Sequence, residues 1–196
     1  PAFNAKGTVT AASSSSISDG ASVVVIASAA FAAENGLKPI ARIVAYSSHA
    51  QAPEWFTTAP SPAIRKAIAG AGWKVTDVDL FEINEAFAVV AEKFIRDLDL
   101  DRDKVNVNGG AMALGHPIGA TGSMLIGTVL DELERRGLQR GLVTMCAAGG
   151  MAPAAAGARL LHGPLLRHGE PRATLREAVH APTPVAVRDR RRAHEA

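Results

Sequence analysis

Two side chains suited to acid–base or nucleophilic chemistry lie within glycine-dense turns of this chain. His116 belongs to the stretch V-N-V-N-G-G-A-M-A-L-G-H-P-I-G-A-T-G, residues 105–122, and Cys146 belongs to G-L-V-T-M-C-A-A-G-G, residues 141–150. Glycine loses much backbone entropy on folding, so this density indicates tight turns or a backbone that passes close to a ligand. We therefore expect these turns to present His116 and Cys146 to a site.

The neighbours of His116 predict a neutral imidazole. Pro117 follows it, and proline is favoured at the first position of a helix, so His116 should lie near a helix N-terminus. The helix dipole at that end disfavours the imidazolium. A neutral imidazole can accept a proton from a nucleophile or donate a hydrogen bond to a developing oxyanion. In isolation, such a histidine is more often structural, and a lone buried cysteine is more often an inert small hydrophobic residue.

Three sequence blocks together resemble the carboxyl-terminal half of the thiolases, which form or cleave 3-oxoacyl-CoA by Claisen chemistry. The pattern N-G-G-x-x-x-L-G-H-P-x-G-x-[ST]-G is followed by T-x-C-x-x-G-G, and residues 79–88 read D-L-F-E-I-N-E-A-F-A. The blocks stand in the order of that family over roughly residues 7–153. The resemblance implies an α/β fold, with a mainly parallel or mixed sheet and helices packed on both faces.

The resemblance implies catalytic roles for individual residues. His116 would activate a nucleophilic cysteine, Cys146 would act as acid and base, and Asn84 would position a water that holds the thioester oxygen together with His116. The turn after Cys146 offers backbone N–H groups that would lower the pKa of its thiol and form a second oxyanion hole, with Ala148 among them. Many thiolases have glycine where Ala148 stands, and alanine keeps the donor unless the site needs a positive φ.

The resemblance also implies contacts with coenzyme A. Residues 11–18 read A-A-S-S-S-S-I-S, a composition typical of a flexible linker. They also fit the family pattern T-A-x-x-x-S-x-x-x-D-G-A, in which Ser15 contacts the pantetheine arm. Ala86 and Phe87 of the N-E-A-F segment are the other residues implied to bind coenzyme A. The CoA thioester is a substrate, and no covalently bound cofactor is expected.

Asn84 also has a purely structural interpretation. Asparagine before a helical pattern is a favoured N-cap, and here Asn84 directly follows an apolar run that reads as a strand. Both interpretations can hold, because a junction from strand to helix is where an open α/β sheet presents binding groups.

One catalytic group of the resembled family is absent. Thiolases carry their acyl-accepting cysteine in the amino-terminal half, whereas the single cysteine here matches the second one. We therefore interpret the chain as a fragment or one half of a split enzyme, inactive alone, that needs an amino-terminal half to act on acetoacetyl-CoA or another short 3-oxoacyl-CoA. The whole enzyme would be a homodimer or homotetramer. The alternative is a non-catalytic half that binds only CoA thioesters or a partner.

Hydrophobic periodicity and turn residues predict alternating strands and helices. We expect strands over residues 21–28, 41–47, 78–83 and 141–145, the first of them buried, helices over 29–35, 62–71 and 118–136, and an irregular segment over 51–61. Alternation of this kind implies a mainly parallel sheet with right-handed crossovers. The aromatic residues of the irregular segment could line an acyl channel or form a hydrophobic plug.

The carboxyl-terminal segment departs from this pattern. Residues 151–164 have low strand propensity, and the remainder is rich in arginine, alanine and proline without periodicity. We expect three regions, namely a lead-in with a CoA-contacting loop over residues 1–20, the domain over 21–154, and a tail over 155–196. The tail would be either the product of a shifted reading frame or genuinely disordered.

Composition excludes several other classes. The net charge is +2, and from residue 161 onward seven arginines face four acidic residues, so the arginine run is a solvated tail rather than a nucleic-acid site. A single cysteine fits a reducing compartment, and no apolar segment reaches membrane-spanning length, so we expect a cytoplasmic chain. His116 and Cys146 have no partners at zinc spacing, so no metal is expected. Phosphate-loop, dinucleotide and hydrolase motifs are lacking.

Overall fold

The computed structural model describes residues 4–160 and 185–187 of the chain. Within these residues, six strands form one sheet in the order β1-β6-β2-β5-β4-β3. The strands are β1 (Val25–Ala27), β2 (Ala41–Ala50), β3 (Leu80–Ile83), β4 (Arg140–Thr144), β5 (Met151–Arg159) and β6 (Val185–Val187). Residues 161–184 and 188–196, which include the arginine run, lie outside the described part.

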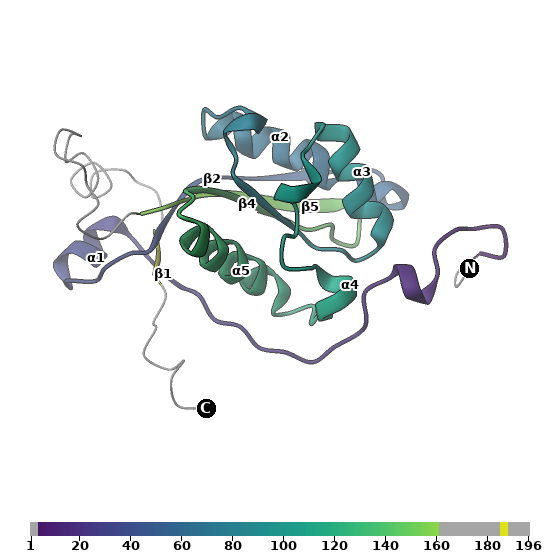
Figure 1. The fold of residues 1–196 in the computed structure, drawn as a ribbon, viewed down its shortest axis with the longest axis horizontal. Helices are drawn as coiled ribbons and strands as arrows, with labels where there is room; N and C mark the ends of the chain where they lie inside the picture. Colours follow the sequence, from purple (N-terminus) through teal and green to yellow (C-terminus); the bar gives the residue numbers. More distant parts are fainter. Residues whose placement is uncertain (1–3, 161–184, 188–196) are drawn as a thin grey trace.

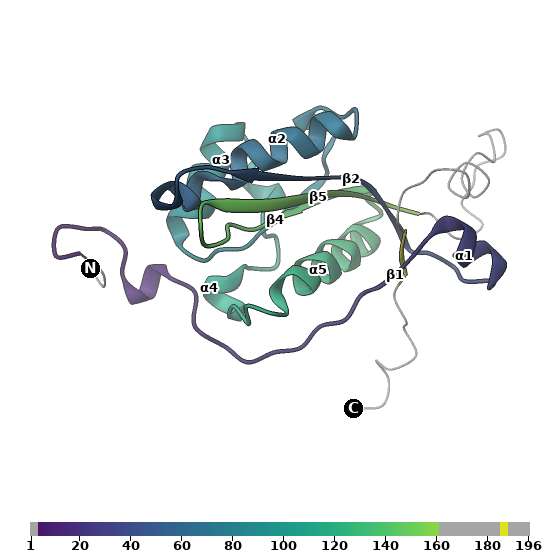
Figure 2. The ribbon, with the colours of Figure 1, turned by 180° about the vertical axis from the view of Figure 1, so that it is seen from behind.

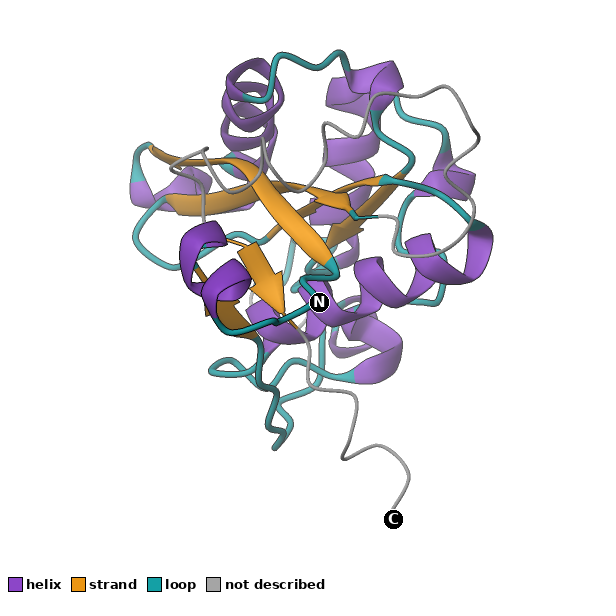
Figure 3. Ribbon diagram, turned by 90° about the vertical axis from the view of Figure 1, so that its left-hand side faces the viewer, coloured by secondary structure: helices purple, strands orange, loops and turns teal. Residues whose placement is uncertain are grey.

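Helices cover both faces of this sheet (Figures 1 and 3). Helices α2 and α3 lie on one face, whereas α4 and α5 lie on the other (Figure 1). The α-helices are α1 (Ala29–Glu34), α2 (Pro60–Gly70), α3 (Ala88–Leu98), α4 (Ala111–Leu114) and α5 (Thr121–Arg136), and the short 3-10 helices are η1 (Ala11–Ser13), η2 (Pro53–Thr58), η3 (Val75–Asp77) and η4 (Arg102–Lys104). The predicted α/β class with helices on both faces is confirmed.

Alternation along β3 divides the core into two layers. Phe81 and Ile83 belong to the larger apolar cluster, with α2 and α3, whereas Leu80 belongs to a second cluster with α5. Successive side chains of a strand point to opposite faces, and both faces are apolar here because both are covered. Glu82 shares the face of Leu80 and is a buried polar exception.

The sheet is mixed, and most of its pairs are antiparallel. Strands β3 and β4 pair in parallel, whereas the pairs β4·β5, β5·β2, β2·β6 and β6·β1 are antiparallel. The mixed sheet that the resemblance allows is confirmed, whereas the mainly parallel sheet expected from alternating strands and helices is wrong. The reason is the short turn over residues 145–150, which returns the chain directly beside β4 without a crossover helix.

The alanine-rich segment after that turn forms a central strand. Strand β5 runs from Met151 to Arg159 between β2 and β4, five residues past residue 154, where we expected the domain to end (Figure 2). Ala152, Ala154 and Ala156 are buried in the larger core cluster. The segment forms a strand despite its low strand propensity, because pairing on both edges and burial against α2 outweigh the intrinsic preference of its residues.

The predicted first strand is shorter and more exposed than expected. Only Val25–Ala27 is a strand, and it lies at an edge of the sheet, paired with β6. Val25 is 44% exposed and Ile26 is 55% exposed, so the expected burial of this apolar run is wrong within the described residues.

Several helix ends lie at or near the predicted residues. The Ser28 hydroxyl accepts a hydrogen bond from Phe31 N at 3.1 Å and caps α1, and Gly36 follows that helix with φ +61°. Helix α5 ends at Arg136, as predicted, and its C-cap residue Gly137 is left-handed with φ +68°. Its start at Thr121 is three residues later than expected. No helix in the described part of the chain is long and apolar enough to cross a membrane.

Candidate active site

Asn84 directly follows β3, at the carboxyl ends of the two parallel strands. Its backbone N–H donates to Thr144 O at 3.0 Å, which continues the β3·β4 ladder, and its side chain is buried. Helix α3 begins only at Ala88, and Phe87 is its N-cap residue. The interpretation of Asn84 as a helix cap is therefore wrong, and its amide is held at the strand end.

The structure brings Asn84 and His116 together. Asn84 Nδ2 lies 3.3 Å from His116 Nε2, and His116 Nδ1 lies 2.7 Å from Thr121 Oγ1. The Thr121 hydroxyl donates its single proton to Pro117 O at 2.9 Å, so toward His116 it can only accept. This network assigns the proton to Nδ1 and leaves a lone pair on Nε2, which accepts from the Asn84 amide.

Burial favours the neutral form of this imidazole. The pKa of His116 is lowered from its usual 6.5 because the half-buried ring loses solvation of its charged form. The expected direction is confirmed, but the expected cause is not. Residues 117–120 form a turn closed by Ala120 N and Pro117 O at 2.8 Å, so Pro117 is not the first residue of α5.

The oxygen of the Asn84 side-chain amide, unlike its nitrogen, has no partner among the described residues. This atom, Asn84 Oδ1, is buried. Leaving an amide oxygen unpaired in the interior costs about 1–3 kcal/mol. Asn84 Oδ1 is therefore suited to accept a hydrogen bond from a bound water or ligand.

Cys146 lies two residues after the end of β4. It is close in topology to Asn84, because Ile83 and Thr144 pair at the adjoining strand ends. Its thiol is free and buried. No hydrogen bond joins this thiol to Asn84 or His116 within the described structure. Burial raises the pKa of Cys146 above its usual 9.0, opposite to the lowering that we expected from backbone N–H groups.

The turn after Cys146 takes its unusual backbone angles at glycine. Gly149 and Gly150 have φ values of +81° and +82°, whereas exposed Ala148 does not have a positive φ. Alanine is therefore compatible with this turn, and its backbone N–H is retained. Gly150 is also sterically required, because a Cβ there would lie 2.1 Å from Gln51 O.

The serine-rich segment pairs with the N-E-A-F block. Ser14 forms an antiparallel bridge with Phe87, and Ser15 N donates to Ala86 O at 3.0 Å. The three residues expected to contact coenzyme A, Ser15, Ala86 and Phe87, are therefore neighbours. The flexible-linker interpretation of this serine run is wrong, because its backbone is held by pairing.

The same segment continues to the histidine turn (Figure 1). His116 N donates to Ser16 O at 3.2 Å, and Ile17 forms a parallel bridge with His116. Gly115 permits this approach, since its φ is +88° and a Cβ would lie 2.3 Å from Ser18 Oγ. Residues 14–18 thus connect the two loops that carry Asn84 and His116.

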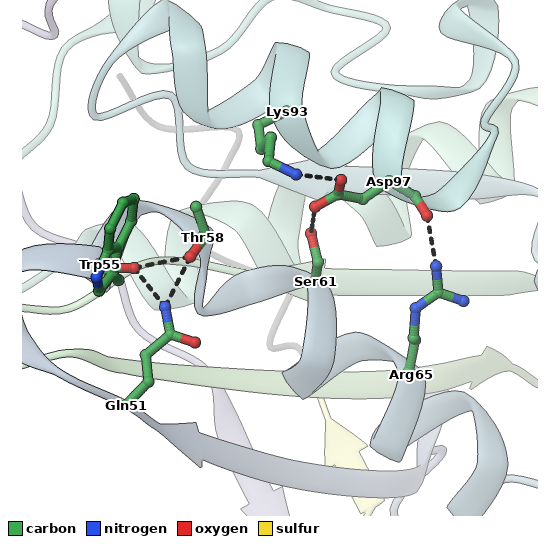
Figure 4. Close-up of polar contacts among 7 residues, drawn as sticks. All are labelled: Gln51, Trp55, Thr58, Ser61, Arg65, Lys93 and Asp97. Atoms are coloured by element: carbon green, nitrogen blue, oxygen red, sulfur yellow. Dashed lines mark hydrogen bonds and ion pairs between the residues drawn. The ribbon is translucent and has the colours of Figure 1, made fainter.

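Of the aromatic residues in the segment after β2, Trp55 is exposed, whereas Phe56 packs near the site. Figure 4 shows the contacts of Gln51 with Trp55 and Thr58. The Gln51 side-chain amide donates to Trp55 O and to Thr58 Oγ1, the latter at 2.7 Å, which closes η2. Trp55 is 61% exposed. Phe56 packs edge-on against Phe87, with ring centroids 6.4 Å apart. Phe56 therefore reaches the residues expected to bind coenzyme A.

Polar contacts between α2 and α3 stabilise that arrangement (Figure 4). Ser61 Oγ donates to the Asp97 carboxylate at 2.9 Å, and Lys93 pairs with the same carboxylate. Arg65 donates to the backbone oxygen of Asp97. These contacts fix α3, whose N-cap residue is Phe87.

Two residues near the site were missed from the sequence. Thr121 occupies the [ST] position of the pattern quoted above, so a signal for it was present. Asn106 bonds to the backbone beside Asn84, and nothing in its local sequence indicates that contact. In the part of the chain that the structure describes, no three His, Cys, Asp or Glu side chains gather to hold a metal ion.

Comparisons with known proteins point to one family. The family model for the thiolase C-terminal domain matches residues 37–158, and the model for the thiolase N-terminal domain matches residues 1–30. An acetyl-CoA acetyltransferase of Rhizobium meliloti (strain 1021) is 48% identical over 154 residues, which cover 79% of this chain and 39% of that protein. The cytosolic acetyl-CoA acetyltransferase of Mus musculus is 49% identical over 148 residues, which cover 76% and 37%.

A solved structure shows the same fold. The crystal structure of the Bacillus anthracis acetyl-CoA acetyltransferase matches with a TM-score of 0.79 and 46% identity, over 82% of this chain and 41% of that one. The chain thus spans about two fifths of the length of the relatives that it matches. Sequence, fold and family model agree, and the chain belongs to the thiolase family.

Proposed function

We propose that this chain provides the carboxyl-terminal half of an acetyl-CoA acetyltransferase that acts on acetoacetyl-CoA or another short 3-oxoacyl-CoA. The observation that carries the proposal is the contact between Asn84 and the unprotonated Nε2 of His116, beside the buried oxygen Asn84 Oδ1. The names of the relatives support the same reaction.

In the first step, His116 acts on a cysteine of the amino-terminal half. Its Nε2 takes the thiol proton, and the thiolate attacks the 3-oxo carbon of the substrate. The thioester oxygen, on which charge develops as the bond between the second and third carbons breaks, is held by the protonated His116 and by a water that Asn84 Oδ1 orients. The lowered pKa of His116 supports this role, because the ring is neutral and able to accept a proton at neutral pH.

Cys146 transfers a proton to or from the second carbon of the substrate, which lies between the two carbonyl groups. Cleavage of the bond between the second and third carbons leaves an enolate of acetyl-CoA, and the Cys146 thiol protonates it. The raised pKa of Cys146 supports this assignment, since the thiol is protonated at neutral pH before the cleavage. Its thiolate then serves as base in the reverse, condensing direction, with the backbone N–H of Ala148 in the second oxyanion hole.

We place the coenzyme A arm along Ser15, Ala86 and Phe87, with no covalently bound cofactor and no metal. The hydrogen bond from Ser15 N to Ala86 O supports this placement because it joins the two segments concerned. Phe56 lies against Phe87 and would border the same path.

The partner in this proposal is an amino-terminal thiolase half. The segment that matches the N-terminal family model exposes much apolar surface, at Ile17 (99%), Val23 (84%) and Ile26 (55%). Such surface is typical of an interface. We also propose that the whole enzyme is a cytoplasmic homodimer or homotetramer.

The alternative function is a non-catalytic half that binds CoA thioesters. In this alternative, Cys146 follows β4 and matches the proton-shuttling residue of the family, but it takes part in no proton transfer.

Complementation separates the two functions. This chain is mixed with the amino-terminal half of a related acetyl-CoA acetyltransferase, and CoA-dependent loss of acetoacetyl-CoA is followed. We expect turnover by the mixture, none by either half alone, and a large loss with His116→Ala. Saturable binding of acetyl-CoA to a well-formed but inactive mixture would instead establish the non-catalytic alternative.

A further inference from the structure

The side chain of Asn106 holds the residues on both sides of Asn84, through the backbone of Ile83 and the side chain of Glu85. Asn106 Oδ1 accepts from Ile83 N at 2.7 Å, and its Nδ2 donates to Ile83 O at 2.9 Å. The same Nδ2 donates to Glu85 Oε1 at 2.7 Å. The backbone N–H of Asn106 adds a fourth bond, to Phe81 O at 2.9 Å.

Asn106 acts as a substitute for a neighbouring strand. Strand β3 ends the sheet order, and β4 pairs with its other edge, where Asn84 N donates to Thr144 O at 3.0 Å. An amide side chain carries a donor and an acceptor, so it can satisfy both the N–H and the C=O of one residue at the open edge. Asn106 has φ +48°, a conformation that asparagine tolerates better than most residues.

Asn106 touches neither His116 nor Asn84 through its side-chain bonds. The contact between Asn84 Nδ2 and His116 Nε2 is already long, at 3.3 Å, so a small rotation of the peptide units beside Asn84 would break it. Ile83 precedes Asn84, and Asn106 bonds to both its N–H and its C=O. Glu85 follows Asn84, and Asn106 bonds to its carboxylate.

We propose that Asn106 is a positioning residue that aims the Asn84 amide at His116. The proposal rests on the proposed function for its kinetic consequence, but its geometric consequence belongs to this chain alone. Asn108, two residues later, offers a matched control. Its Nδ2 donates to Glu132 Oε2 of α5 at 3.2 Å and makes no bond beside Asn84.

The kinetic test uses the complemented enzyme. Asn106→Gly removes the side-chain bonds while tolerating the positive φ, and Asn106→Asp keeps the acceptor for Ile83 N but faces Glu85 with a second carboxylate. A misplaced catalytic group can cost up to ~100-fold, so kcat should fall by about that factor with KM nearly unchanged. The kcat of Asn106→Asp should be lower than that of Asn106→Gly, and Asn108→Ala should retain most of the parent activity. In a chain that already carries Asn84→Ala, adding Asn106→Gly should reduce kcat only slightly further.

A second readout needs no turnover. The full chain has five asparagines, at residues 4, 35, 84, 106 and 108, so asparagine-selective 15N labelling gives few side-chain amide signals. The Asn84 signals, identified by their loss in Asn84→Asp, should shift as His116 titrates. That response should vanish in Asn106→Gly and in Asn106→Asp and persist in Asn108→Ala. A response retained in both Asn106 variants, or lost equally in Asn108→Ala, would overturn the proposal, whereas an inactive parent mixture would count only against the proposed function.

Discussion

Glu82 should make the stability of this chain fall as pH rises through the neutral range. Its side chain lies on the face of β3 that α5 covers, and the residue is only 2% exposed. Burial, followed by the charges of Glu85 and Glu132, raises the pKa of Glu82 from 4.5 to about 8. Glu132 in turn is paired with Arg135 and Arg136, which hold that carboxylate ionised.

The sign follows from the two ionisation equilibria of Glu82. Below pH 4.5 the carboxyl is protonated in both the folded and the unfolded chain, and the contribution of Glu82 to the free energy of unfolding is at its full value. Between pH 4.5 and about 8 the unfolded chain loses the proton while the folded chain keeps it, so the free energy of unfolding decreases. A pKa difference of this size corresponds to roughly 5 kcal/mol over the whole window. That is comparable with the total stability of a small domain, about 5–15 kcal/mol.

Urea unfolding of the full chain at several pH values between about 5 and 8 measures this effect. This range lies between the ordinary pKa of Glu82 and its raised pKa of about 8. Glu82→Gln cannot ionise, so its free energy of unfolding should decline much less than that of the parent over the same range. Glu92→Gln is the control, because Arg102 lowers the pKa of exposed Glu92 and its contribution is lost only under acidic conditions. Parallel pH profiles for the parent and Glu82→Gln would refute the reasoning.

Three further predictions concern the site and its turns. Thr121→Val should shift His116 toward the other tautomer in 15N spectra, while Thr121→Ser should preserve the parent pattern. In rapid-quench measurements on the complemented enzyme, His116→Ala should impair acylation, whereas Cys146→Ser should spare acylation more than condensation; equal losses in both steps would contradict the assigned roles. Gly150→Ala should destabilise the chain more than Gly36→Ala in urea unfolding, because both have positive φ but only Gly150 would place a Cβ 2.1 Å from a backbone oxygen.

The roles of the site residues stay predictions, but two of these residues, Asn84 and His116, do lie together in the fold. His116 and Cys146 could be proposed from their glycine-dense turns, whereas Asn84 was proposed from the resemblance of its N-E-A-F segment to the family. Asn106 could not be proposed, because its partners at Ile83 and Glu85 are more than twenty residues away, and a side chain that mimics a strand has no local signature. Long-range hydrogen bonds of this kind depend on the sheet order, which periodicity alone does not determine.

In the fold, too, features that depend on local residues were predicted better than features that depend on distant ones. The start of α1 at Ala29 and the end of α5 at Arg136 were predicted correctly, because helix ends depend on local residues such as Gly137. Strand β5 was missed because its alanines gain stability only from pairing between β2 and β4 and from burial against a helix. Strand β1 was judged buried from its apolar residues alone, although burial depends on what packs against them.

The central claim is that this chain contributes the histidine that activates a cysteine on another half. The direct measurement is mass spectrometry of that amino-terminal half after brief exposure to acetoacetyl-CoA in the presence of this chain. We expect its nucleophilic cysteine to become acetylated with the parent chain and to remain largely unmodified with His116→Ala. Equal acetylation with the parent, with His116→Ala and with this chain omitted would contradict the account.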